Sequence, residues 1–314
     1  MTSMMAVRIH GYGGTDVLVY EAAPRPIVGE GEVLIRVHAT SVNPFDCGVR
    51  AGYLAAWYNY SFPLILGLDV SGVIEQVGAG VTNVAPGDAV FTRSDPSHND
   101  AYAEYIVVPA DQAVAKPQSI DHIRAAALPH VTLTAWAGLI HGADLAAGQT
   151  VLIHGAAGGV GHIAVQLAKW RGAKVIGTAT SRNHDFLRGL GVDEVIDYTA
   201  TPFDNVVRGV DVVLDTQGGD TLERSWTTLK PGGLLLSTVQ PPSEEAAAAH
   251  GVRGSFVMAA QTDPVTLTTV AGLVDAGTIK SEVSTVLPLQ DVERGHELSE
   301  SKHTRGKIVL QVAA

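Results

Sequence analysis

The stretch Val151–Trp170, VLIHGAAGGVGHIAVQLAKW, decides the fold of this chain. Its first four residues are apolar and are typical of a short strand that is covered on both faces. A glycine-rich turn follows, and from Gly158 to Trp170 apolar residues recur at helical spacing. A buried strand, a glycine turn and a helix in this order form the first unit of a doubly wound parallel sheet.

The alternation continues downstream. Lys174–Ala179 predicts a second strand and Asn183–Leu190 a second helix. The further strands of the series are expected at residues 194–198, 211–219 and 232–239, and at Ser255–Ala259. These strands are continuously apolar, as strands of a buried parallel sheet are.

Upstream, residues 6–109 contain short strands separated by turns and predict a small, barrel-like β domain. A helical, alanine-rich pattern covers Ile120–Trp136. After a helix near 264–276, the last strand, Gly306–Val312, returns to the style of the first domain. We therefore predict a discontinuous β domain, 1–123 with 263–314, and a nucleotide-binding domain, 124–262.

Composition restricts the class of protein further. The 314 residues correspond to about two domains, and with 46% hydrophobic and 17% charged residues the chain can bury a core. The net charge of −11 disfavours nucleic acid as a partner. A single cysteine, Cys47, permits no internal disulfide and fits a reducing compartment. With no signal peptide at the N-terminus and no apolar run of about 18 residues, we expect a cytoplasmic protein without a membrane span.

The glycine turn indicates a phosphate-binding site. At the N-terminus of a helix, glycines let backbone amides approach a pyrophosphate and let the helix pack closely on the strand. Ala156 replaces the first glycine of the G-x-G-x-x-G pattern, but the strand before the turn and the helix after it support the interpretation. The residues expected to contact a dinucleotide are Ala157, Gly158, Gly159, Val160 and Gly161.

The residues after the second strand favour NADPH over NADH. An NAD-binding fold places Asp or Glu there to bond the ribose hydroxyl, whereas here no carboxylate precedes Asp185. Thr178 and Ser181 can donate hydrogen bonds, and Arg182 can pair with a phosphate. Short-chain dehydrogenases are a less suitable class, because no tyrosine of this chain has a lysine four residues later.

Over nearly its whole length the chain resembles the medium-chain dehydrogenase/reductase superfamily, and most closely its zinc-free quinone oxidoreductase branch. The residues that carry the resemblance are Asn43-Pro44-Phe45-Asp46, Arg50, Gly52-Tyr53, Pro63–Gly72, Pro86-Gly87-Asp88, Ala103-Glu104-Tyr105, Ala126–Pro129, Thr132–Ala135, His154–Gly161 and Gly306–Leu310. The resemblance implies a GroES-like β-barrel catalytic domain, a Rossmann domain and a homodimer. It also places Thr134 and Asn43 at the cofactor.

Zinc-dependent members of the superfamily would have a cysteine ligand near Asn43 and Gly-His-Glu where Gly67-Leu68-Asp69 stands, so no metal is expected. Without a Lewis acid, the natural acceptor is a small molecule that is already electrophilic. We expect hydride transfer from NADPH to a quinone, with Tyr53 and Asn43 as donors to the developing oxyanion. The alternatives are reduction of the C=C bond of an enone, alkenal or enoyl substrate, and binding of NADPH without turnover.

Overall fold

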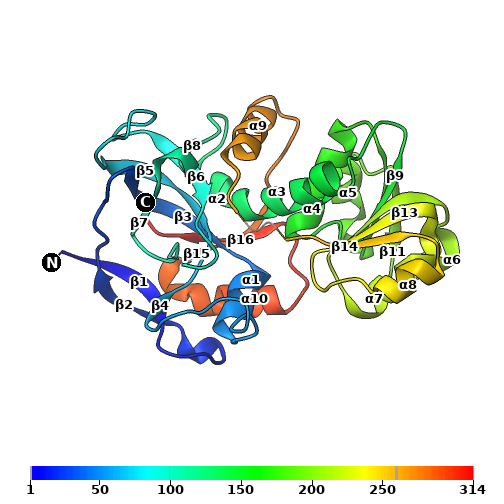
Figure 1. Ribbon diagram of the computed structural model, residues 1–314, viewed down its shortest axis with the longest axis horizontal. Coiled ribbons are helices and arrows are strands. Elements are labelled where there is room, and N and C mark those ends of the chain that lie inside the picture. The colour runs from blue at the N-terminus through cyan, green and yellow to red at the C-terminus, as the bar shows by residue number, and fades with distance from the viewer. Residues whose placement is uncertain (1, 99, 259–260, 314) are drawn as a thin grey trace. The chain divides into compact units, whose positions relative to one another are not determined.

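The computed structural model describes residues 2–98, 100–258 and 261–313, and the chain forms two units (Figure 1). Unit 1 consists of Met1–His130, Ala260–Gly277 and Ser281–Ala314, and unit 2 of Val131–Ala259 and Thr278–Lys280. The domain boundaries expected after residues 123 and 262 stay predictions.

Unit 1 is built from two sheets. A three-stranded sheet has the order β2-β1-β4, and a seven-stranded sheet has the order β15-β16-β3-β5-β6-β8, with β7 also paired to β3. The strands are β1 (Ser3–Ile9), β2 (Val19–Pro24), β3 (Glu32–Val42), β4 (Leu64–Ile65), β5 (Asp69–Val77), β6 (Ala89–Arg93), β7 (Tyr105–Pro109), β8 (Val114–Ala115), β15 (Val283–Pro288) and β16 (Lys307–Gln311). The helices are α1 (Pro44–Arg50), α2 (His122–Ala126), α9 (Pro264–Asp275) and α10 (Val292–Glu300).

The C-terminal strand closes unit 1. Strand β16 pairs antiparallel with β3, with Ile308 opposite Val42 and Leu310 opposite Thr40. Apolar side chains of β16 and of α10 join one buried cluster with residues of β1, α1 and β4. Because β16 lies next to β3 in the sheet, Lys307 comes to lie beside the end of β3 and the start of α1.

Unit 2 is a six-stranded parallel sheet with the order β11-β10-β9-β12-β13-β14. Its strands are β9 (Thr150–Ile153), β10 (Lys174–Ala179), β11 (Glu194–Asp197), β12 (Val210–Asp215), β13 (Leu229–Ser237) and β14 (Arg253–Phe256). Its helices are α4 (Gly159–Trp170), α5 (His184–Gly189), α6 (Phe203–Val206), α7 (Gly219–Ser225) and α8 (Glu244–Ala249). The strand order runs outward in both directions from β9, which confirms the doubly wound sheet.

Two local expectations need correction. The helix expected over Ile120–Trp136 is two helices, α2 and α3 (Pro129–Trp136), because Pro129 disfavours a helical conformation of the residue before it. Strand β14 begins and ends earlier than expected, at Arg253 and Phe256, and Ala259 lies outside the described residues. Among the helices that the structure describes, none is long and apolar enough to cross a membrane.

Candidate functional site

The glycine turn of unit 2 leads directly from β9 into α4. Gly155 adopts a positive φ of 64°, and Gly158 is the N-cap of α4 with no side-chain cap. The first backbone N–H groups of α4 therefore carry the positive end of the helix dipole without a competing side chain. The predicted residues 157–161 all lie at this helix start.

Gly161 is the glycine of the turn that backbone atoms constrain most closely. A Cβ atom at this position would lie 2.2 Å from the carbonyl oxygen of Gly155 and 2.8 Å from Cα of Ala156. At Gly158 the nearest atom, the same carbonyl oxygen, would lie at 3.2 Å. Close contact between helix and turn thus requires glycine at 161, which fits the role expected for the last glycine of a dinucleotide-binding turn.

A buried histidine, His154, is connected to the turn through hydrogen bonds of Thr178. His154 Nε2 lies 3.0 Å from Ser225 Oγ, which itself donates to the carbonyl oxygen of Thr221 at 2.6 Å. Nε2 therefore carries the proton, and Nδ1 accepts from the Thr178 hydroxyl at 3.2 Å. Burial, and then the Arg224 guanidinium, lower the pKa of His154 to about 3, so the ring stays neutral.

This hydrogen-bond chain includes Thr178, one of the residues expected at the cofactor. The residue is buried, its hydroxyl proton is directed to His154, and its oxygen accepts the N–H of Gly155 at 3.3 Å. Its single proton is therefore not available to a phosphate. Thr178 thus helps to shape the turn, and its expected contact with the cofactor stays a prediction.

Ser181 and Arg182 lie exposed in the loop that follows β10, as a phosphate contact requires. The sequence did not reveal that Asp197 lies beside this loop. Ala179 pairs with Asp197 across β10 and β11, and the N–H of Ser181 donates to Asp197 Oδ2 at 3.0 Å. Only the pairing of the two strands could have shown this.

Thr134 lies on α3 and is 6% exposed. Its contact with a cofactor stays a prediction.

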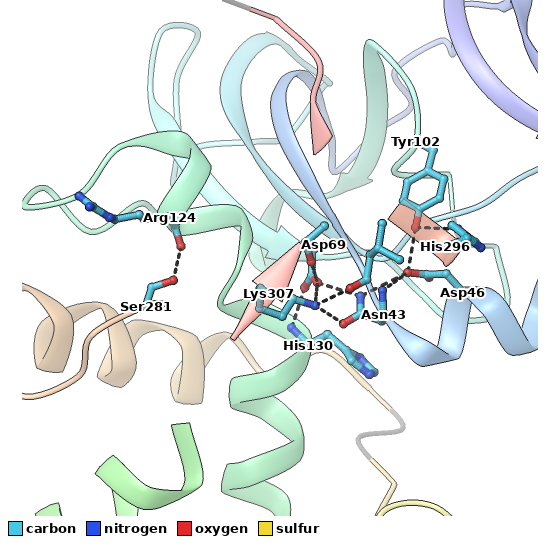
Figure 2. A network of polar contacts seen from close by, with 11 residues as sticks. Asn43, Asp46, Asp69, Tyr102, Arg124, His130, Ser281, His296 and Lys307 are labelled. Carbon is cyan, nitrogen blue, oxygen red and sulfur yellow. Dashed lines mark hydrogen bonds and ion pairs between the residues drawn. The ribbon is translucent and has the colours of Figure 1, made fainter. Parts of the chain in front are cut away.

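In unit 1, Asn43 lies at the centre of a buried polar network (Figure 2). Its side-chain NH₂ donates to Asp69 Oδ2 at 2.9 Å, and its Oδ1 accepts from Lys307 Nζ at 2.5 Å. The residue is completely buried, and its backbone N–H is bonded to Asp46 Oδ2 at 2.7 Å. Both ends of the amide are engaged, so Asn43 positions the start of α1. Its expected roles at the cofactor and as a donor to substrate stay predictions.

Asp69 and Lys307 form the ionic core of this network. Asp69 is fully buried, and its oxygens accept from Ser41 Oγ at 2.5 Å and from the backbone N–H of His130 at 2.7 Å. Lys307 Nζ lies 3.6 Å from Asp69 Oδ2 and donates to the carbonyl oxygen of Val42 at 3.0 Å. Burial lowers the pKa of Lys307, an effect that the neighbouring carboxylates Asp69 and Asp46 oppose.

A second branch of the network runs from Asp46 toward the surface. Tyr102 Oη donates to Asp46 Oδ2 at 3.1 Å and lies 3.3 Å from His296 Nε2 (Figure 2). Arg50 connects His296 to Glu300, at 3.2 and 2.5 Å. Burial raises the pKa of Asp46 to about 7, and its Oδ1 has no hydrogen-bond partner among the described residues.

The residues of unit 1 do not fit a catalytic zinc ion. Leu68 is apolar and fully buried, and the Asn43 amide is occupied by its neighbours. Burial raises the pKa of Cys47 to about 12, which keeps its sulfur a thiol. No group of three or more His, Cys, Asp or Glu side chains suited to a metal ion occurs in the described part of the chain.

Tyr53 is exposed in the segment that follows α1, as are two other aromatic residues of that segment. Its ring is 81% exposed, and Trp57 and Phe62 are also exposed, at 58% and 40%. Phe62 contacts Tyr12 edge to face, with ring centroids 4.9 Å apart. Tyr60, in contrast, is buried and donates its hydroxyl to the carbonyl oxygen of Pro96, so it packs the loop instead of lining a surface.

Comparison with known proteins gives the family. Residues 29–118 match the family described as "Alcohol dehydrogenase GroES-like domain", and residues 190–310 the family described as "Zinc-binding dehydrogenase". The mitochondrial NAD(P)H oxidoreductase RTN4IP1 of Danio rerio is 33% identical over 99% of this chain and 92% of its own length. A 2-haloacrylate reductase from a Burkholderia species is also 33% identical, over 98% of each chain.

Among solved structures, the quinone oxidoreductase of Escherichia coli complexed with NADPH has a TM-score of 0.89 at 29% identity, and covers 98% of this chain and 100% of that one. The chain belongs to the medium-chain dehydrogenase/reductase superfamily, in its zinc-independent quinone oxidoreductase branch. It is an oxidoreductase of the medium-chain type, as the sequence predicted, and its relatives support a nicotinamide cofactor.

Proposed function

We propose that the protein transfers a hydride from NADPH to a quinone without the help of a metal ion. One observation carries this proposal. Where zinc-dependent members of the superfamily have metal ligands, this chain has the Asn43 amide, bonded to Asp69 and Lys307, and the buried, apolar Leu68. An alcohol needs a Lewis acid to be ionised, whereas a conjugated acceptor is already electrophilic. The donor set of unit 1 therefore favours reduction of a conjugated acceptor.

NADPH supplies the hydride when it is bound, and the chain positions it. The amides at the start of α4, held by Gly155 and Gly161, would bind the pyrophosphate. Ser181 and Arg182 are exposed after β10, where the fold places the adenosine ribose. Arg182 supports NADPH as the preferred cofactor, because a guanidinium matches a phosphate group.

Tyr53 is the candidate proton donor to the reduced acceptor. Its exposed hydroxyl has no side-chain partner in the described residues, so it is available to a substrate oxygen. The exposed rings of Trp57 and Phe62 suit a flat acceptor. This role rests on the resemblance and on exposure, and it is tested by the variant described in the Discussion.

Reduction of the C=C bond of an α,β-unsaturated carbonyl is the second candidate. It is supported by the similarity to the 2-haloacrylate reductase, whose name describes a conjugated acid as substrate. Both reactions need the same hydride donor and an oxyanion stabiliser, so they differ only in the acceptor that the surface around Tyr53 admits.

We also propose a homodimer that forms through the edge strand β14 and resides in the cytoplasm. The free edge of β14 supports pairing of this kind. The relative from Danio rerio is a mitochondrial protein, and fractionation of cells that express this chain tests the compartment.

The test is the rate at which nicotinamide absorbance is lost with purified protein. NADPH and NADH are compared against naphthoquinones, alkyl enones and alkenals, with and without a chelator. NADPH-selective turnover that the chelator does not change supports the proposal, and the ranking of acceptors decides between its two forms. Tight NADPH binding with no turnover on any acceptor would favour a binding protein instead. The variant Arg182→Ala is expected to weaken NADPH binding and to leave NADH binding nearly unchanged.

A further inference from the structure

The carboxylate of Asp197 lies beside the loop that follows β10. Its Oδ2 accepts the N–H of Ser181 at 3.0 Å, and its Oδ1 accepts the N–H and the hydroxyl of Thr199 at 2.9 and 2.6 Å. The bonds from Thr199 are the largest cause of a lowered pKa, to which Ser181 and the charge of His184 add. Asp197 is therefore ionised at neutral pH.

The position of this charge is the important point. In a doubly wound fold, the residue at the carboxyl end of the second strand selects the cofactor, because it lies against the adenosine ribose. Here that strand is β10, and it ends at Ala179 without an acidic residue. Asp197 ends the neighbouring strand opposite Ala179 and brings a carboxylate to the same loop.

Two opposite charges thus flank the place of the ribose. Arg182, in the loop, attracts a 2′-phosphate, whereas Asp197 repels one and can accept a hydrogen bond from a 2′-hydroxyl. We infer that Asp197 is a specificity-determining residue that reduces the preference for NADPH and allows NADH to bind. This inference rests on the proposed nicotinamide site and concerns its selectivity.

The variant Asp197→Asn tests the inference by binding and not by turnover. The amide keeps an oxygen that can accept the N–H of Ser181, and it removes the charge. Binding constants are measured by calorimetry for NADPH and NADH, and for the fragments 2′,5′-ADP and 5′-AMP, which differ only in the 2′-phosphate. Loss of a like charge within about one Debye length is expected to tighten NADPH and 2′,5′-ADP about two- to tenfold. NADH and 5′-AMP are expected to bind as before or more weakly.

Asp185→Asn is the matched control. This carboxylate is 98% exposed and pairs with Arg188 at 2.9 Å, so the variant changes the net charge by the same amount at a nearby position of the chain. We expect it to change the ratio of the NADPH and NADH binding constants less than twofold. A similar change in both variants would mean that net charge alone is responsible, and it would overturn the inference.

The other outcomes are also decisive. If Asp197→Asn weakens all four ligands to the same degree, Asp197 only holds the loop in shape, and the inference is wrong. If the variant leaves the ratio of NADPH to NADH unchanged, the inference is also wrong, although the proposed function stands. If the unaltered protein binds neither cofactor, the proposed function itself fails.

Discussion

The variant Gly161→Ala tests the phosphate-binding turn most directly. The added Cβ would lie 2.2 Å from the carbonyl oxygen of Gly155, with Cα and the carbonyl carbon of Ala156 at 2.8 and 2.9 Å. All three are backbone atoms, so no side-chain rotation can relieve the clash. The turn or the first turn of α4 must move, and overpacking of this kind costs about 1–3 kcal/mol.

This cost gives the magnitudes. For a domain of the size of unit 2, each kcal/mol lowers Tm by about 3–5 °C, so Tm is expected to fall by about 3–15 °C. The displaced amides also lose their alignment with the pyrophosphate, and we expect NADPH binding to weaken at least tenfold, which corresponds to about 1.4 kcal/mol. Thermal unfolding monitored by circular dichroism and calorimetric titration with NADPH measure the two effects.

Gly189→Ala is the control for this variant. Gly189 ends helix α5, and a Cβ there would meet no atom within 4 Å. Replacement of an unstrained helical glycine by alanine stabilises a protein by about 0.4–1 kcal/mol, and NADPH binding should not change. Wild-type Tm and wild-type NADPH affinity in Gly161→Ala would refute the argument that close packing of α4 on the turn forms the cofactor site.

Three further predictions concern unit 1. Lys307→Met leaves the buried carboxylate of Asp69 without its cation and should lower the free energy of unfolding by about 3–5 kcal/mol in chemical denaturation; a loss below about 1 kcal/mol would contradict this. Asp46 has a pKa of about 7 in the folded protein, above its ordinary value of 3.8, so its contribution to stability is greatest at low pH and is lost as pH rises from about 4 to about 7. Asp46→Asn should remove that part of the pH dependence, with a slope of up to about 1.4 kcal/mol per pH unit, and parallel stability curves of the two proteins would be evidence against it. Tyr53→Phe should lower turnover more for an enone than for a quinone, and small, equal losses on both acceptors would exclude Tyr53 as the proton donor.

The nucleotide-binding unit was predictable because its signals are local. The strand, the turn and the helix of Val151–Trp170 are consecutive, and each has its own pattern of residues. The early end of the helix expected at Ile120–Trp136 was predictable in principle as well, since Pro129 disfavours helix at the residue before it. The role of Thr178 was not, because its hydroxyl is directed by His154 and Ser225, which different elements supply.

The polar network of unit 1 shows why the sequence could single out a polar residue such as Asn43 but could not predict its hydrogen-bond partners. Asn43 and Tyr102 lie far apart in sequence from Lys307 and His296, and only the closure of the sheet by β16 and the packing of α10 bring them together. A hydrogen-bonding residue in a motif can face substrate or can satisfy a buried partner, and the sequence pattern is the same in both cases. In the structure the amide of Asn43 bonds Asp69 and Lys307, and its contact with substrate stays a prediction.

The same network holds the end of β3 and the start of α1 in place by hydrogen bonds and an ion pair. A buried charge is tolerated only when it is paired and hydrogen-bonded, and such pairs contribute more to a defined geometry than to stability. Lys307 binds the last carbonyl of β3 and the Asn43 amide at the start of α1, while Asp69 binds Asn43 from β5. Three chain segments are thereby joined at one point, directly before the turn that carries Tyr53. A substitution of Asn43 would remove contacts to both charged residues, whereas a substitution of the exposed Tyr53 would leave those contacts in place.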